Sequence, residues 1–313
     1  MYRRYIRWIN SELSQKRPHP DVPLLLQFAM AERCDSSVLA SDLEDGGVAF
    51  GKSRKASNDH GNHLNIIADR FNSLSEVTVA LKRLGIDNCG LIFGIDYTLS
   101  NKVSGEKTFH GLSLHDTTSQ KNNPYQEVIC ILGETLEPMD DDGIIPAYGF
   151  GDRTVRDKGI FPLKKEGECD GFLEVLEVYN EITPTVRLGG PTNFAPLIDE
   201  AVRIVKQKKQ YHILVIVADG QVTNEEDTIR SIVEASEYPL SIVCIGVGDG
   251  PWDIMNDFDD KLPERRFDNF QFVDFHSTKS EARNPQAAVA LAALMEIPDQ
   301  VKYIRDNKLI EKL

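Results

Sequence analysis

The sequence predicts an α/β fold, a doubly wound and mostly parallel sheet with helices on both faces. Apolar runs of strand length recur along the chain, as in Leu91–Thr98, His212–Ala218 and Ser241–Val247. Stretches with a helical spacing of apolar residues, such as Asn193–Lys206, separate these runs. This alternation of strands and helices is typical of a parallel sheet that is covered on both faces.

The remaining elements continue the alternation. The first helix is expected from Leu74 onward, where apolar residues share one face, and Gly85 is a suitable C-cap. Further helices are predicted over Tyr125–Leu136, Gly171–Tyr179, Glu225–Ala235 and Ala287–Glu296. Further strands are predicted over Ile145–Gly149, Val186–Leu188 and Phe270–Phe275.

Composition divides the chain into three regions. Residues 1–63 are expected to be a largely disordered N-terminal extension, because residues 34–63 are rich in small and polar residues without periodicity. The basic start of this extension fits a targeting or partner-binding arm, but a frayed terminus or an imperfect gene model is the favoured explanation. Residues 64–304 are expected to form the α/β domain, and residues 305–313 a C-terminal tail.

Charge and cysteine content exclude several classes of function. The 313 residues carry a formal net charge of -14, which argues against general binding of nucleic acid or of an anionic membrane. The five cysteines are scattered and lack metal-ligand spacing, so we expect a reducing intracellular setting, the cytoplasm or the nucleus. No apolar run is long enough to span a membrane, and the start is not a signal peptide. Position 2 is Tyr2, so no N-myristoylation is expected.

A candidate metal site begins where the first predicted strand ends, in the pattern Asp96-x-Thr98-x-Ser100. Alternation along an extended chain places these three side chains on one side of the backbone. A carboxylate and two hydroxyls are hard oxygen donors of the kind that suits Mg²⁺. The carboxyl ends of parallel strands are also where open α/β sheets bind their ligands. A strand end capped by Ser/Thr turn chemistry explains the same residues.

Two further residues extend this candidate site. Thr192 stands in a glycine-proline loop before a predicted helix, and Asp219 closes the apolar strand His212–Ala218. Taken singly, Thr192 fits a helix N-cap and Asp219 fits an Asp-Gly turn. Right-handed crossovers, however, bring the ends of the two strands to one edge of the sheet, and the Thr192 loop is expected there too. The five residues together predict binding of Mg²⁺ or Mn²⁺, with Ca²⁺ a poorer fit.

The order and type of these residues resemble the metal-ion-dependent adhesion site of von Willebrand factor type A domains. The resemblance extends to the copine-type subgroup and to the plant RING-domain ubiquitin ligases that share its A domain, over roughly residues 66–304. It is carried by the segments Ile95–Asn101, Asn123–Gln126, Ile145–Asp152, Gly190–Pro196, Ala218–Thr223, Gly246–Trp252, Phe267–Val273 and Ala293–Pro298.

The resemblance implies a metal-ion-dependent protein-interaction module. In such a site the cation keeps an open position, which an Asp or Glu of a protein partner fills. Copines carry two C2 domains for phospholipid binding, and the region before residue 66 is too short for one. The plant ligases carry a C-terminal RING, but no cysteine follows Cys244 here, so this chain is not expected to build its zinc sites.

The alternative function is a component or truncated form of an E3 ubiquitin-protein ligase of plant type, working with the ubiquitin-conjugation machinery. The sequence offers no nucleophile and base pair that would make the chain itself an enzyme. For His115 a surface position or a hydrogen-bonded structural role is favoured over catalysis.

Three other segments admit a site but are explained more simply. The glycine-rich segment Gly246–Gly250 lacks the spacing and the Lys-Ser/Thr pair of a phosphate-binding loop. The acidic segment Asp140–Gly143 lacks a Glu at the twelfth position of a calcium loop, so a solvated turn is expected. Asp152 fits the rim of the metal site and a turn after a strand equally well.

Overall fold

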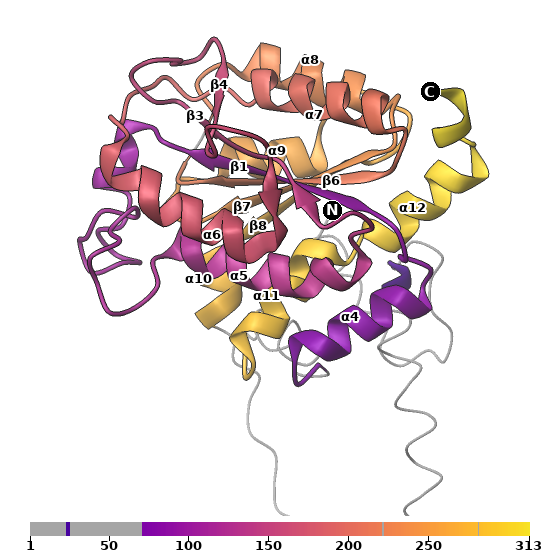
Figure 1. The fold of residues 1–313 in the computed structure, drawn as a ribbon, viewed down its shortest axis with the longest axis horizontal. Helices are drawn as coiled ribbons and strands as arrows, with labels where there is room; N and C mark the ends of the chain where they lie inside the picture. Colours follow the sequence, from indigo (N-terminus) through magenta and orange to yellow (C-terminus); the bar gives the residue numbers. More distant parts are fainter. Residues whose placement is uncertain (1–22, 26–70, 221, 281) are drawn as a thin grey trace, which may run out of the picture.

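A six-stranded sheet in the order β4-β3-β1-β6-β7-β8 forms the centre of the chain in a computed structural model (Figure 1). The structure describes residues 23–25, 71–220, 222–280 and 282–313. All neighbouring strands are parallel except β4, which is antiparallel to β3, so the predicted α/β fold is confirmed. The strands are β1 (Gly90–Asp96), β3 (Ala147–Phe150), β4 (Ile160–Pro162), β6 (His212–Ala218), β7 (Leu240–Gly246) and β8 (Phe270–Asp274).

Strands β1, β6 and β7 are buried along their whole length, which is why they are apolar on both faces. In β1 and β6 the register pairs Ile95 with Val217. Because the two strands are parallel, Asp96 at the end of β1 and Asp219 just after β6 reach the same edge of the sheet. The register therefore brings two of the predicted metal ligands to one place.

Helices cover both faces of this sheet (Figure 1). One face carries α7 (Ala195–Lys208), α8 (Glu225–Ala235) and α9 (Asp253–Asp260), whose apolar residues pack against Ile216, Cys244 and their neighbours. The other face forms the larger core, around Phe93, Val215 and Val243. It is covered by α4 (Leu74–Arg83), α5 (Pro124–Leu136), α6 (Gly171–Ile182), α10 (Phe275–Ser280), α11 (Pro285–Leu294) and α12 (Ile297–Asp306).

Two predicted strands differ from the observed elements. The predicted strand Ile145–Gly149 is divided at Pro146, because β2 (Ile144–Ile145) pairs with β5 (Cys169–Asp170) while β3 joins the main sheet. A proline has no N–H for the ladder, so it suits the point where the chain changes sheets. The predicted strand Val186–Leu188 is wrong: Leu188 and Gly189 form only isolated bridges, to Asp152 and Thr98. The edge strand β4 and the helices α9, α10 and α12 have no counterpart among the predicted elements.

The predicted boundaries of the three regions lie in a chain of which the structure describes only a part. Of the proposed extension 1–63, residues 23–25 alone are described, and the rest lies outside the described residues. Leu25 is fully buried in the larger core, and the Leu24 N–H donates to the Asp299 carboxylate of α12 at 2.8 Å. At the other end, α12 continues to Asp306 and Leu309 is buried. In the described part of the chain, no helix has the length and apolar character needed to cross a membrane.

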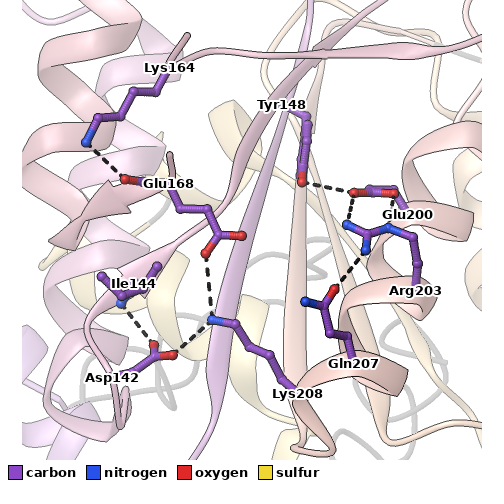
Figure 2. Close-up of polar contacts among 9 residues, drawn as sticks. All are labelled: Asp142, Ile144, Tyr148, Lys164, Glu168, Glu200, Arg203, Gln207 and Lys208. Atoms are coloured by element: carbon purple, nitrogen blue, oxygen red, sulfur yellow. Dashed lines mark hydrogen bonds and ion pairs between the residues drawn. The ribbon is translucent and has the colours of Figure 1, made fainter. Parts of the chain in front are cut away.

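A polar network holds α7 against neighbouring loops and β3 (Figure 2). The Tyr148 hydroxyl of β3 donates to Glu200 at 3.1 Å, and Arg203 donates to the same carboxylate at 2.7 and 2.8 Å. Lys208, the last residue of α7, forms an ion pair with Asp142 at 2.9 Å. Asp142 also accepts the Ile144 N–H at 3.0 Å, so the acidic segment is a turn bound to α7.

Candidate metal centre

The candidate site lies where β1 and β6 end. Asp96 is the last residue of β1 and is fully buried, and Asp219 directly follows β6 and is 1% exposed. Oδ1 of Asp96 accepts the backbone N–H of Thr98 at 2.8 Å, which turns the chain immediately after the strand. This turn is made by the Asp96 carboxylate and not by a Ser or Thr hydroxyl, and it uses only one of the two carboxylate oxygens.

Two hydroxyl groups join the carboxylates. Oγ1 of Thr98 and Oγ of Ser100 lie 2.9 Å apart, and the Ser100 hydroxyl donates to Oδ1 of Asp219 at 3.0 Å. Oγ1 of Thr98 lies 3.5 Å from the same carboxylate oxygen. Four of the five residues predicted from the sequence are thus gathered in one cluster.

Thr192 reaches this edge mainly through its backbone. Its carbonyl accepts the N–H of Thr223 at 2.9 Å, so its loop lies against the loop that follows Asp219, as expected. None of the hydrogen bonds among the described residues links the Thr192 hydroxyl to Asp96 or Asp219. Thr192 is not the N-cap of α7 either, since that position is Phe194, and Oδ1 of Asn193 accepts the N–H of Ala195 at the start of the helix.

The electrostatics of the site favour a cation. Oδ2 of Asp96 and Oδ2 of Asp219 are both buried without a hydrogen-bond partner among the described residues. Burial raises the pKa of Asp96 well above its usual value, and the charge of Asp219 raises it further. Burial also raises the pKa of Asp219, against hydrogen bonds from Ser104 and Ser100 that lower it. Two adjoining carboxylates whose charged forms are disfavoured by burial are a suitable setting for a divalent ion.

The donor set also limits the kind of metal. Among residues 71–220, 222–280 and 282–313, with 23–25, no three His, Cys, Asp or Glu side chains come together in a way that could hold a metal ion. The candidate site instead combines two carboxylates with hydroxyl oxygens. Such donors fit Mg²⁺ or Mn²⁺ better than Zn²⁺, which prefers nitrogen and sulfur ligands.

Beneath the site lies a buried aromatic network that the sequence did not reveal. The ring of His115 stacks between Tyr97 and Tyr125, with centroids 4.7 and 4.2 Å away. Nε2 of His115 lies 2.7 Å from the Asp96 carbonyl oxygen, and Nδ1 lies 2.9 Å from the Tyr179 hydroxyl. Burial lowers the pKa of His115 to about 4, so the ring is neutral at neutral pH. A neutral ring donates from Nε2 and accepts at Nδ1 here, since a carbonyl can only accept.

The hydrogen-bonded role expected for His115 is thus what the structure shows, and the surface position is wrong. Asn101 completes the network, because its Nδ2 donates to the Asp96 carbonyl at 3.2 Å and its Oδ1 accepts from Tyr125 at 2.6 Å. The fixed tautomer and the two stacked rings make His115 a support for the end of β1. The distance in sequence between Asp96 and His115 hid this relationship, because the intervening loop has no regular pattern.

Glycine allows the loops to approach the site closely. Gly151 follows β3 with a φ of +74°, and a Cβ there would lie 2.5 Å from Cγ2 of Thr98. A Cβ at Gly248 would lie 2.4 Å from the Asp219 carbonyl oxygen. Any larger residue at either position would push the chain away from the two carboxylates.

Asp249 fixes the loop that carries Ser100. Its carboxylate accepts the N–H groups of Lys107 and Thr108 at 2.9 Å each and the Thr108 hydroxyl at 2.7 Å. Its own N–H donates to the Ser104 carbonyl at 2.7 Å. The glycine-rich segment after β7 therefore presents a carboxylate to this loop.

Asp152 acts in a turn. Its Oδ1 accepts the N–H groups of Thr154 and Val155 at 3.0 and 2.8 Å. Of the two roles that the sequence left open, these contacts fit the turn after β3.

Comparison with known proteins gives relatives of two kinds. A family model described as Copine matches residues 113–312. "Copine family protein 2" of Caenorhabditis elegans is 55% identical over 245 residues, which are 77% of this chain and 3% of that protein. "Copine family protein 1" of the same animal is 50% identical over 77% of this chain and 22% of its own length. "E3 ubiquitin-protein ligase RGLG3" of Arabidopsis thaliana is 49% identical over 79% of this chain and 71% of that protein.

The chain thus spans less than a quarter of each of these two worm proteins. Because worm and plant relatives are both about half identical, the expected plant origin is not confirmed. Among solved structures, the manganese-loaded TRAP protein of Plasmodium vivax is 14% identical over 66% of this chain and 72% of that chain, with a TM-score of 0.42. The von Willebrand factor type A protein of Catenulispora acidiphila is 14% identical over 66% and 43%, with a TM-score of 0.42.

Proposed function

Because this chain belongs to the copine family, we propose that it is a metal-ion-dependent protein-interaction module that binds a partner's carboxylate through Mg²⁺ or Mn²⁺. The observation that carries the proposal is the pair of buried oxygens without a partner, Oδ2 of Asp96 and Oδ2 of Asp219. Unpaired buried charge is costly, and a divalent cation between two carboxylates would offset that cost.

Each residue of the site has a separate part in this proposal. Asp96 and Asp219 supply the negative charge, and Thr98, Ser100 and Thr192 supply neutral oxygens. Two carboxylates offset the charge of a divalent ion without exceeding it. Where one or both of them bind through water, the ion stays electron-poor and keeps an open position for one further anion. An Asp or Glu side chain of a partner protein is an anion of suitable size for that position.

Metal binding can be tested without knowing the partner. Calorimetry with MgCl₂ or MnCl₂ should show one site in the natural chain and none in Asp96→Ala or Asp219→Ala. Circular dichroism should show that both variants remain folded. Equal metal affinity in all three proteins would refute the assignment.

Partner binding requires a second experiment. Proteins captured by the immobilised chain should be lost when EDTA is added, and the Asp219→Ala variant should not capture them with or without EDTA. A full set of captured proteins that survives chelation would show that the metal is not part of the binding surface.

A second candidate function is that of a component of a ubiquitin ligase. It is favoured by the ligase relative of Arabidopsis, of which this chain covers 71% at 49% identity. The described residues hold no cluster of three or more His, Cys, Asp or Glu for a metal such as zinc, so we expect the purified chain to transfer no ubiquitin by itself. An autoubiquitination assay with activating and conjugating enzymes tests this, and chain-dependent transfer would contradict the expectation.

A further inference from the structure

Four exposed cations stand on two segments whose backbones contact loops of the candidate metal site, and they form what we call the basic collar. Its members are Arg153, Arg156 and Lys158 in the loop between β3 and β4, and Arg187 in the segment before the Thr192 loop. From the exposure of these cations and the contacts of their backbone we infer that the site takes an acidic segment of a protein partner, rather than a single isolated carboxylate. This inference rests on the proposed metal-dependent binding and specifies the chemistry of the partner.

The loop of the basic collar is attached to the metal site at its beginning. Gly151 lies so close to the site that a Cβ there would be 2.5 Å from Cγ2 of Thr98 and 3.4 Å from Oδ1 of Asp96. Two residues later, the N–H of Arg153 donates to the Arg187 carbonyl at 2.8 Å. The backbones of Arg153 and Arg187 are therefore side by side, although the two residues are distant in sequence.

The same loop is attached to the Thr192 side of the site at its other end. Nδ2 of Asn193 donates to the Asp157 carbonyl at 3.0 Å, and Asp157 lies between Arg156 and Lys158. On the first side, Gly189 donates to the Tyr97 carbonyl at 3.1 Å and its carbonyl accepts the N–H of Leu99 at 2.8 Å. The backbone of the basic collar thus runs from the Thr98 side of the site to the Thr192 side.

The charges of the basic collar are not paired with acidic side chains of the described residues. In the part of the chain that the structure describes, none of these four side chains forms an ion pair. Arginines elsewhere do: Arg203 pairs with Glu200, and Arg266 with Glu237, both at distances below 3 Å. Figure 2 shows the ion pairs of Arg203 with Glu200 and of Lys208 with Asp142. A concentration of unpaired cations beside one site, in a chain of net charge -14, indicates complementarity to an anionic partner.

The overall charge decides which anionic partner is favoured. A nucleic acid or an anionic membrane extends well beyond the basic collar and would meet the negative charge of the remaining surface. A short acidic segment of a protein can contact the basic collar alone. Leu99 and Val103, on the loop of Ser100, are 53% and 71% exposed and offer apolar contacts beside the site. One Asp or Glu of the segment would bind the cation, and neighbouring carboxylates would pair with the arginine forks.

The test is fluorescence anisotropy with a labelled glutamate-rich peptide in the presence of MnCl₂, and with a second peptide in which glutamine replaces every glutamate. The collar variant Arg153→Gln/Arg156→Gln/Arg187→Gln is compared with a control of the same net charge. The control replaces three exposed arginines that are distant in sequence from the site and ion-paired, as Arg230→Gln/Arg266→Gln/Arg305→Gln.

We expect the collar variant to bind the glutamate peptide about tenfold more weakly, as for the loss of several exposed charge contacts. The control should retain the affinity of the natural chain, and calorimetry should show the same affinity for Mn²⁺ in all three proteins. If the collar variant and the control lose the same affinity for the glutamate peptide, net charge alone explains the loss and the inference is wrong.

Failure of the inference and failure of the proposed function are distinguishable. If the chain binds Mn²⁺ but the collar variant binds the peptide as the natural chain does, the inference fails and the metal site stands. If the peptide binds equally well in EDTA and still requires the arginines, the basic collar stands and the metal-dependent function fails. Tighter binding of phosphatidylserine vesicles or single-stranded RNA than of the peptide would overturn the assignment to a protein partner.

Discussion

The hydroxyl of Ser100 lies 3.0 Å from Oδ1 of Asp219, although the two residues are 119 positions apart in the sequence. This contact joins the loop after β1 to the end of β6. It leaves Oδ2 of Asp219 buried and without a partner, as is Oδ2 of Asp96. The site therefore contains more negative charge than its own hydrogen bonds satisfy.

Replacing Asp219 by Asn should stabilise the metal-free chain by about 1–3 kcal/mol, because one of two adjoining buried charges is removed. Excess Mg²⁺ should raise the stability of the natural chain by about 2.7 kcal/mol at a hundredfold excess over Kd, and leave the variant unchanged. Thermal unfolding with EDTA or with MgCl₂ measures both effects. A variant that responds to Mg²⁺ as the natural chain does would exclude Asp219 as a ligand.

Gly151→Ala should lower both stability and metal affinity. The new Cβ would lie 2.5 Å from Cγ2 of Thr98, and the positive φ of +74° adds backbone strain, so a loss of about 2–4 kcal/mol is expected. Gly143→Ala is the matched control, since its φ is +65° but no atom lies within 4 Å of its added Cβ. Chemical denaturation and calorimetry with MnCl₂ measure the two losses. Similar behaviour of both variants would show that strain alone matters and that the contact with Thr98 does not.

Asp249→Ala should free the loop that begins at Ser100. Its carboxylate holds the N–H groups of Lys107 and Thr108, so hydrogen exchange at these amides should become faster while the core strands stay protected. Asp142→Ala, which removes a similar turn contact to the Ile144 N–H, serves as the control and should not affect this loop. Unchanged exchange at residues 107 and 108 would contradict the role given to Asp249.

Asp140 should make the chain less stable at neutral than at acidic pH. Both of its carboxylate oxygens are buried without a partner, and burial, with Asp142 adding to it, raises its pKa to about 6. A raised pKa means that its stabilising contribution is complete below about pH 4 and is lost as the pH rises through about 6. Because the residue is only half-buried, Asp140→Asn should stabilise the chain by about 1–2 kcal/mol at pH 7 and by nothing at pH 4.

Urea unfolding at the two pH values provides the comparison for Asp140. Asp141→Asn, at an exposed position of the same turn, is the control and should have no effect at either pH. A gain for Asp140→Asn that is the same at pH 4 and pH 7 would show that charge is not its cause.

The sequence predicted the elements whose pattern is set by burial. The strands that contain Ile95, Val217 and Cys244 are apolar throughout because helices cover both of their faces, and such runs are visible without a structure. The family resemblance was confirmed by the copine model and by relatives about half identical. The metal-binding role of the five residues remains a prediction.

Other features depend on contacts that are distant in sequence. The role of His115 required two tyrosines, one on either side of its ring, and neither spacing nor composition predicts that arrangement. Pro146 divides a run that reads as one strand, because the partner of Ile145 is Cys169 and not β1. Short antiparallel pairs of this kind carry too few residues for a recognisable alternation.

The carbonyl oxygen of Asp96 fixes the position of this residue in the site. His115, Tyr125 and Asn101 all lie within hydrogen-bond distance of it, at 2.7, 3.3 and 3.2 Å, while the carboxylate of the same residue turns toward the loops. The carbonyl of Asp96 is thus held by buried hydrogen bonds, and its carboxylate lies, also buried, at the edge of the sheet. Movement of Asp96 on ligand binding would break these buried contacts, so the end of β1 is held in a fixed position. Any change of conformation on partner binding is therefore expected in the loops around Asp96. Selectivity for a partner then depends on how well its side chain fits this fixed residue.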